Sequence, residues 1–94
     1  MLIIAGHLLV EPRDRATFLE ANRGVALHAR STLGCLDFVQ AADPLDEGRI
    51  NIFERWETEA DLLSFRGDGR PSEGSPPILV AHVTRYDVTA IGEP

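Results

Sequence analysis

Glu54 and Trp56 lie two residues apart in a segment with the alternating pattern of a β-strand, so both side chains project from the same face. The other residues of that face, Ile50 and Ile52, are apolar. A carboxylate among apolar side chains loses hydration, and its pKa rises toward the range in which it accepts a proton near neutral pH. Glu54 is therefore a candidate general base, and Trp56, the only tryptophan, is a candidate wall of the same pocket.

A structural role for Glu54 is the alternative interpretation. An ion pair with Arg30 or Arg85 would hold a helix against the sheet and would leave the carboxylate without a part in chemistry. Trp56 is also open to two interpretations, because a lone tryptophan at a strand end is a common core residue as well as a platform for a ligand.

The three histidines do not have the spacing of a metal site, since no two of them are four residues apart, and we expect no bound metal. His7 is a second candidate base. We expect His28 on the solvent side of a helix, and His82 on one strand face with Tyr86, where both are candidates to contact a substrate. Cys35 has no histidine near it in the sequence and is expected to be a small buried apolar residue.

Strands and helices that position these residues are also predicted by the sequence. We expect strands at residues 2–10, 35–42, 49–56 and 78 to about 90. A first helix starts at Pro12 and Asp14 and runs to about Ser31, with Gly24 interrupting its interior. Thr58 begins the capping sequence Thr-Glu-Ala-Asp, which starts a second helix that ends near residue 66.

The order β-α-β-β-α-β predicts an α+β, ferredoxin-like fold with a four-stranded antiparallel sheet and both helices on one face. Two helices leave the other face uncovered. Phe53 lies on that face, because it alternates with Trp56 along the strand. We therefore expect a second copy of the chain to pack sheet against sheet, which makes the protein a homodimer.

Composition narrows the possible functions. A chain of 94 residues, 44% of them hydrophobic, fits one domain over residues 1–94 and leaves no room for a separate cofactor-binding domain. A formal charge of −6 is unfavourable for binding nucleic acid or an anionic membrane surface. With a single cysteine and an apolar start that lacks a basic leader and a cleavage site, the chain is expected in the cytoplasm.

Several segments resemble the antibiotic biosynthesis monooxygenase (ABM) family. They are Ala-Gly-His-Leu to Pro-Arg-Asp at residues 5–14, Gly-Cys-Leu-Asp-Phe at 34–38, Glu-Arg-Trp-Glu-Thr at 54–58 and Arg-Tyr-Asp-Val at 85–88. The resemblance implies a dimeric α/β barrel. It also implies cofactor-free oxidation of quinols or anthrones in some branches and degradation of haem in another. Phe65 stands where the quinol-oxidising branch often has a histidine, so that imidazole is missing here.

The leading hypothesis is a cofactor-independent monooxygenase that oxidises a small aromatic quinol or polyketide phenol with O2. Its expected catalytic residues are Glu54 and His7, and its expected substrate-binding residues are Trp56, His82, Tyr86 and Phe65. The alternatives are a non-catalytic binding module for a hydrophobic small molecule and a haem-binding or haem-degrading protein. The segment 67–77, rich in glycine and proline, is a candidate lid over the pocket.

Overall fold

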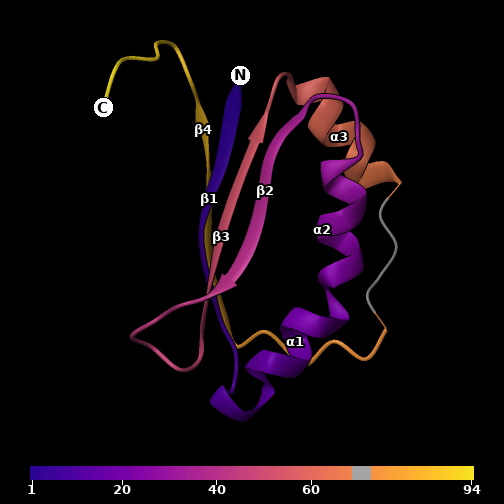
Figure 1. Cartoon of the computed structure of the whole chain (residues 1–94), viewed down its shortest axis with the longest axis vertical. Helices are drawn as coiled ribbons and strands as arrows, with labels where there is room; N and C mark the ends of the chain where they lie inside the picture. The colour runs from indigo at the N-terminus through magenta and orange to yellow at the C-terminus, as the bar shows by residue number, and fades with distance from the viewer. Residues whose placement is uncertain (69–72) are drawn as a thin grey trace.

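The computed structural model describes residues 1–68 and 73–94 and forms a four-stranded antiparallel sheet with its helices packed against one face (Figure 1). The strands lie in the order β2-β3-β1-β4. Along the chain the elements are β1 (Leu2–Leu9), η1 (Pro12–Asp14), α1 (Arg15–Ala21), α2 (Arg23–Arg30), β2 (Cys35–Ala42), β3 (Arg49–Trp56), α3 (Glu59–Gly67) and β4 (Val80–Asp87). This arrangement confirms the predicted α+β, ferredoxin-like fold.

The first helical region is divided at Asn22, whereas the sequence predicted one helix interrupted at Gly24. That prediction was wrong because Asn22 competes with the helical hydrogen-bond pattern. Its side-chain Nδ2 donates at 2.8 Å to the carbonyl oxygen of Phe18, which already accepts the ordinary helical bond from the backbone N–H of Asn22 at 3.0 Å. A side chain at Gly24 would meet open space, so this glycine is simply tolerated. Phe18 of α1 and Ala29 of α2 are both buried.

The end of β3 and the start of α3 follow the predicted cap. The hydroxyl of Thr58 accepts a hydrogen bond from the backbone N–H of Asp61 at 3.1 Å, which satisfies one of the unpaired donors at the start of a helix. The chain therefore turns directly after Trp56, and α3 packs back onto the sheet. Its side chains join a buried cluster made of Leu2, Ile4, Ala29, Phe38, Trp56, Leu62 and Phe65.

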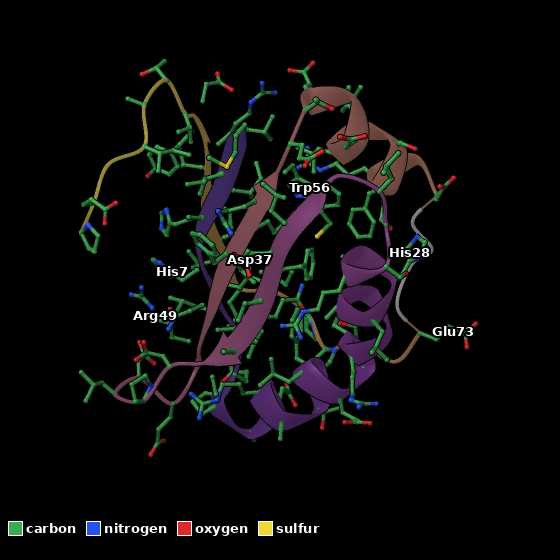
Figure 2. All side chains as sticks on the ribbon, turned by 45° about the horizontal axis from the view of Figure 1, so that its top comes forward. His7, His28, Asp37, Arg49, Trp56 and Glu73 are labelled. Atoms are coloured by element: carbon green, nitrogen blue, oxygen red, sulfur yellow. The ribbon has the colours of Figure 1, made fainter. Side chains whose placement is uncertain are left out.

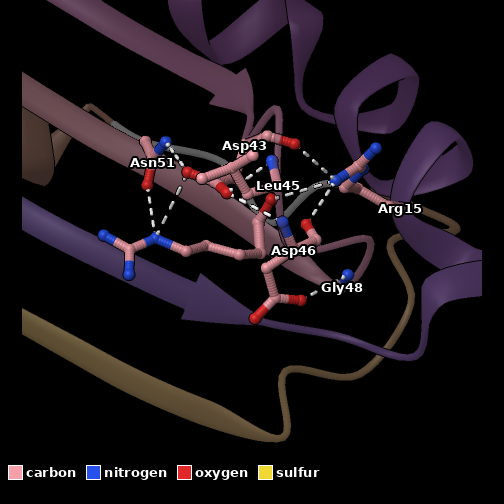
Figure 3. Close-up of polar contacts among 7 residues, drawn as sticks. Arg15, Asp43, Leu45, Asp46, Gly48 and Asn51 are labelled. Atoms are coloured by element: carbon pink, nitrogen blue, oxygen red, sulfur yellow. Dashed lines mark hydrogen bonds and ion pairs between the residues drawn. The ribbon is translucent and has the colours of Figure 1, made fainter.

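Polar contacts hold the loop between β2 and β3 (Figure 3). Asp43 accepts hydrogen bonds from Asn51 Nδ2 and the backbone N–H of Asp46, both at 2.9 Å, and from the backbone N–H of Leu45 at 3.0 Å. These bonds lower the pKa of Asp43 to about 2. Arg15 Nη1 donates to the carbonyl oxygens of Asp43 and Asp46, at 3.1 Å and 2.8 Å. The loop is thus fixed to α1, which helps set where β3 begins.

The sheet face opposite the helices is uncovered in a single chain (Figure 1). Phe53 of β3 is 37% exposed and Tyr86 of β4 is 52% exposed, and the strand register puts both on this face with Ile3 and Ala5 of β1. Exposed apolar side chains on adjoining strands are typical of a surface that another molecule covers. The homodimer remains a prediction.

Strand β4 begins at Val80, two residues after the predicted start at residue 78. The predicted lid, residues 67–77, includes residues 69–72, which lie outside the described part of the chain. None of the helices in the described ranges combines the length and the apolar character needed to cross a membrane.

Candidate active site

Glu54 lies in β3 on the face that the helices cover, paired with Ile4 of β1 and Phe38 of β2. Its side chain is partly buried, and its Oε1 atom accepts a hydrogen bond from the indole Nε1 of Trp56 at 3.0 Å. The structure therefore confirms that the acid and the indole share one apolar face. It also identifies the partner of the carboxylate, which is the indole N–H two residues further along the strand.

Burial raises the pKa of Glu54 above its usual value, while the hydrogen bond from Trp56 and the positive charge of Arg66 act in the opposite direction. Loss of water around the carboxylate is the largest of these effects. A glutamate in this state accepts a proton more readily than a surface glutamate does. This is the property that a general base needs.

The predicted ion pair of Glu54 with Arg30 or Arg85 is wrong for the part of the chain that the structure describes. Arg30 instead donates through Nε to the carbonyl oxygen of Phe38 at 2.9 Å. Arg85 forms an ion pair with Glu59 at 2.6 Å, which joins β4 to the start of α3, and another with Asp87 of its own strand at 2.9 Å. Both arginines therefore hold elements together, but they do so through partners other than Glu54.

The Phe65 ring of α3 lies against the indole on the helix side of the sheet, and the Phe38 ring of β2 lies against Phe65 in turn. The centre of the Phe65 ring lies 5.2 Å from that of Trp56 and 5.8 Å from that of Phe38. Trp56 is fully buried, so its large ring is a core side chain. Its contact with the carboxylate of Glu54 is the hydrogen bond from the indole N–H. Phe65 and Trp56 thus pack against each other in the core, and Trp56 has no exposed surface for a substrate within one chain.

His28 is a neighbour of this group that sequence reasoning left on the solvent side of its helix. Its side chain is exposed as expected, but its ring centre lies 5.4 Å from that of Phe65. An imidazole from α2 therefore stands at the outer edge of the aromatic group. No sequence signal links His28 to Phe65, because the two residues belong to different helices and meet only when both helices pack on the sheet.

A small cavity opens at the edge of the sheet next to this group. It has a volume of about 130 Å³ and is lined by Arg30, Cys35, Leu36 and Asp37, where the pairing of β2 with β3 is irregular. Burial is the largest effect that raises the pKa of Cys35, and the negative charge of Glu54 adds to it. The thiol is therefore held protonated, which disfavours a role as nucleophile.

The remaining predicted site residues lie on the opposite face of the sheet. His7 of β1 pairs directly with His82 of β4, and Tyr86 lies on the same face. In Figure 2, His7 and Arg49 project away from the helices. The structure therefore brings Glu54, Trp56 and Phe65 together, and separately His7, His82 and Tyr86. Within one chain Glu54 and His7 cannot act on the same bound molecule.

In residues 1–68 and 73–94, no group of three or more acidic, cysteine and histidine side chains is arranged to hold a metal ion. Glu54 instead pairs across the sheet with Ile4 and Phe38, which both belong to the buried apolar cluster. The chemistry that this arrangement supports is proton transfer in a water-poor, aromatic environment.

Solved structures with the same fold include PA3566 from Pseudomonas aeruginosa, which is 18% identical, covers 95% of this chain and 94% of its own, and has a TM-score of 0.80. A Deinococcus radiodurans protein provisionally named an antibiotic biosynthesis monooxygenase is 17% identical, with 100% and 98% of the two chains covered and a TM-score of 0.83. Rv0793 from Mycobacterium tuberculosis is 17% identical, with 98% and 97% covered and a TM-score of 0.66. These likenesses establish the fold.

No curated protein matched the sequence. The family model described as antibiotic biosynthesis monooxygenase matches residues 1–69, which include β1, β2, β3, all the helices and the Glu54-Trp56 pair. This match covers well over half of the chain. The protein belongs to the antibiotic biosynthesis monooxygenase family.

Proposed function

We propose that the protein is a cofactor-independent monooxygenase that uses O2 to oxidise a small aromatic quinol or polyketide phenol, with Glu54 as the general base. The observation that supports this is the setting of Glu54, whose Oε1 is held by the Trp56 indole N–H and whose pKa is raised by burial. The hydrogen bond orients the carboxylate, and the raised pKa brings its basicity closer to that of a phenol.

In this reaction Glu54 accepts the phenolic proton, and the phenolate gives one electron to O2. The superoxide and the phenoxyl radical combine to form a peroxide anion at a ring carbon that bears hydrogen, and protonated Glu54 returns its proton to this peroxide. Loss of water from this peroxide gives the quinone, so that one oxygen atom enters the product and the other leaves as water. The aromatic wall formed by Trp56 and Phe65 would keep bulk water away from the radical pair until it recombines.

The test is aerobic turnover of dithranol or a model quinol, followed with an oxygen electrode against the rate of autoxidation. Glu54→Gln keeps the shape and the hydrogen-bond acceptor but cannot take up the proton, and we expect a loss of about 10²-fold or more. Glu57→Gln, at an exposed position three residues further on, is the matched control and should retain full activity. Equal rates for Glu54→Gln and the wild type would overturn the assignment.

A non-catalytic binder of the same aromatic molecules gives a different result in this assay. Binding of the compound would quench the fluorescence of the single tryptophan or protect the compound from autoxidation, but no oxygen would be consumed. His7→Ala separates the second predicted base from the first, because His7 lies on the other sheet face. We expect His7→Ala to remain active, because a substrate that Glu54 deprotonates is bound on the other face of the sheet, away from His7.

The homodimer and the cytoplasmic location are part of the same proposal. The exposed Phe53 and Tyr86 on the open sheet face support packing of two sheets against each other. Phe53→Glu should shift the protein from dimer to monomer in sedimentation velocity. Leu45→Glu is the matched control, since Leu45 is 93% exposed in the loop between β2 and β3 and lies outside this face. A wild-type protein that sediments as a monomer would contradict the proposal.

A further inference from the structure

His7 and His82 form a pair that the function proposed above does not use. They occupy directly paired positions on the antiparallel strands β1 and β4, so their side chains leave the sheet on the same side. Their ring centres are 5.3 Å apart and their planes are tilted by 47°. His82 is exposed and His7 is partly exposed, so solvent reaches both rings.

The close approach of the two strands here depends on Gly6. Its φ of 153° is a conformation that residues with side chains rarely adopt. A Cβ atom at this position would overlap the backbone carbonyl of His82. The glycine therefore lets β4 come near enough to β1 to place His82 beside His7, and the rigid sheet then holds the spacing of the two rings.

The spacing matches that of two imidazoles bound to one metal ion. With a metal–nitrogen bond of about 2.0–2.1 Å and a tetrahedral angle, the centres of two ligating rings lie about 5 Å apart. The observed tilt also differs from a parallel stack, in which the ring nitrogens would not converge on one point. Two imidazoles held at this spacing by adjoining strands can bind one ion with little further ordering.

The charges around the pair permit a cation. Arg49 lies on the same face of β3, two residues from Asn51, the residue that pairs with His7. Its charge is partly balanced, because its Nε atom lies 3.7 Å from Asp43 Oδ1 and donates to Asn51 Oδ1 at 2.7 Å. The nearest side chains of β4 on this face, Val80 and Thr84, are uncharged.

We propose that His7 and His82 form a two-imidazole site for a divalent transition-metal ion of the class that favours nitrogen ligands, such as Zn²⁺, Cu²⁺ or Ni²⁺. Water completes the coordination in one chain. Where two copies pack through this face, a second pair of histidines can do so instead. Both protein ligands come from a single chain and lie on the sheet face opposite Glu54. A test of this site therefore depends neither on the oxygenase chemistry nor on the dimer.

The experiment is a titration of the whole protein with Zn²⁺, followed by isothermal titration calorimetry. His7→Gln and His82→Gln should each weaken the binding by at least about tenfold, since loss of a ligand costs no less than loss of an outer hydrogen bond to one. His28→Gln removes the third histidine of the chain, which lies on α2, and should bind as the wild type does. Far-UV circular dichroism of each variant confirms that it is folded.

Several results would overturn this site. One is a wild-type protein that does not bind Zn²⁺. Another is a binding curve that is unchanged by both His7→Gln and His82→Gln, which would assign the ion to surface carboxylates. A third is an equal loss in His28→Gln. A stoichiometry of one ion per chain or one per two chains supports the site equally, provided that either substitution removes it.

Discussion

Replacement of Trp56 by phenylalanine tests the central contact of the candidate site. Phenylalanine keeps an aromatic ring in the core but removes the N–H that donates to Glu54 at 3.0 Å. A hydrogen bond to a charged group contributes about 1.5–3 kcal/mol, and Glu54 is only partly buried, so the lower end applies. The smaller ring in a fully buried position costs about 1 kcal/mol more. We therefore expect the free energy of unfolding at pH 7 to fall by about 2–3 kcal/mol.

This loss should depend on pH with a defined sign. Because burial raises the pKa of Glu54 in the folded state above its usual 4.5, the folded protein binds this proton more tightly than the unfolded chain does. Stability from this group therefore increases as the pH falls through the raised pKa toward 4.5, and decreases as the pH rises. Trp56→Phe removes a contact that favours the ionised form. Its cost should be largest near neutral pH and smaller near pH 4.

Glu54→Gln completes a double-mutant cycle. Its amide oxygen still accepts from Trp56, but the bond is neutral and worth about 0.5–1.5 kcal/mol, so Trp56→Phe should cost about 1 kcal/mol less in this background. Glu54→Gln alone should be more stable than the wild type at pH 7, because the burial cost of the charge is removed. Urea unfolding must be followed by far-UV circular dichroism, since Trp56 is the only tryptophan. A Trp56→Phe cost that is the same at both pH values and in both backgrounds would refute the reasoning.

Three further substitutions test the elements that position the site. Thr58→Ala should lower the free energy of unfolding by about 1 kcal/mol through loss of the α3 cap, while Ser64→Ala on the exposed side of the same helix should change it little; equal effects would contradict the cap. Gly6→Ala should detach β4 from β1, because a Cβ atom there would overlap the backbone of β4. Hydrogen exchange of the β4 amides should then become faster, and unchanged protection of these amides would contradict the prediction. Wild-type stability should fall as the pH decreases from 3.8 to about 2, where Asp43 takes up a proton. Asp43→Asn should flatten this part of an acid titration, and an unchanged slope would contradict the assignment.

Local sequence signals were sufficient for most of the fold. Alternation fixed the face on which Glu54 and Trp56 lie, and the Thr58 cap fixed where β3 ends and α3 begins, because both depend on residues close together in the chain. The division of the first helical region at Asn22 was not predicted. A side-chain hydrogen bond such as that from Asn22 to the carbonyl of Phe18 can form in a continuing helix or at a helix end, and the packing of the two helical segments decides between them.

The partners of the candidate site could not be predicted in the same way. Arg30 and Arg85 were reasonable partners for Glu54 by charge, but the structure turns Arg30 to a carbonyl oxygen and Arg85 to Glu59 and Asp87. Contacts between elements depend on strand order and on helix placement, which a sequence pattern does not specify. The pairing of His7 with His82 is of this kind, because 75 positions separate them and only the β1-β4 register makes them neighbours.

Strand parity makes the separation of the two groups a stable property of the molecule. Glu54 pairs with Ile4, and His7 pairs with Asn51, so the two side chains point to opposite faces. Shifting β1 by one residue would bring His7 to the helix side, but it would turn the buried Leu2 and Ile4 outward at the same time. Exposing two such side chains costs about 3–6 kcal/mol, a large part of the 5–15 kcal/mol that typically stabilises a domain. The register therefore keeps the partly buried acid on the face that the helices cover and the histidines on the open face, and substitutions in one group should leave the properties of the other unchanged.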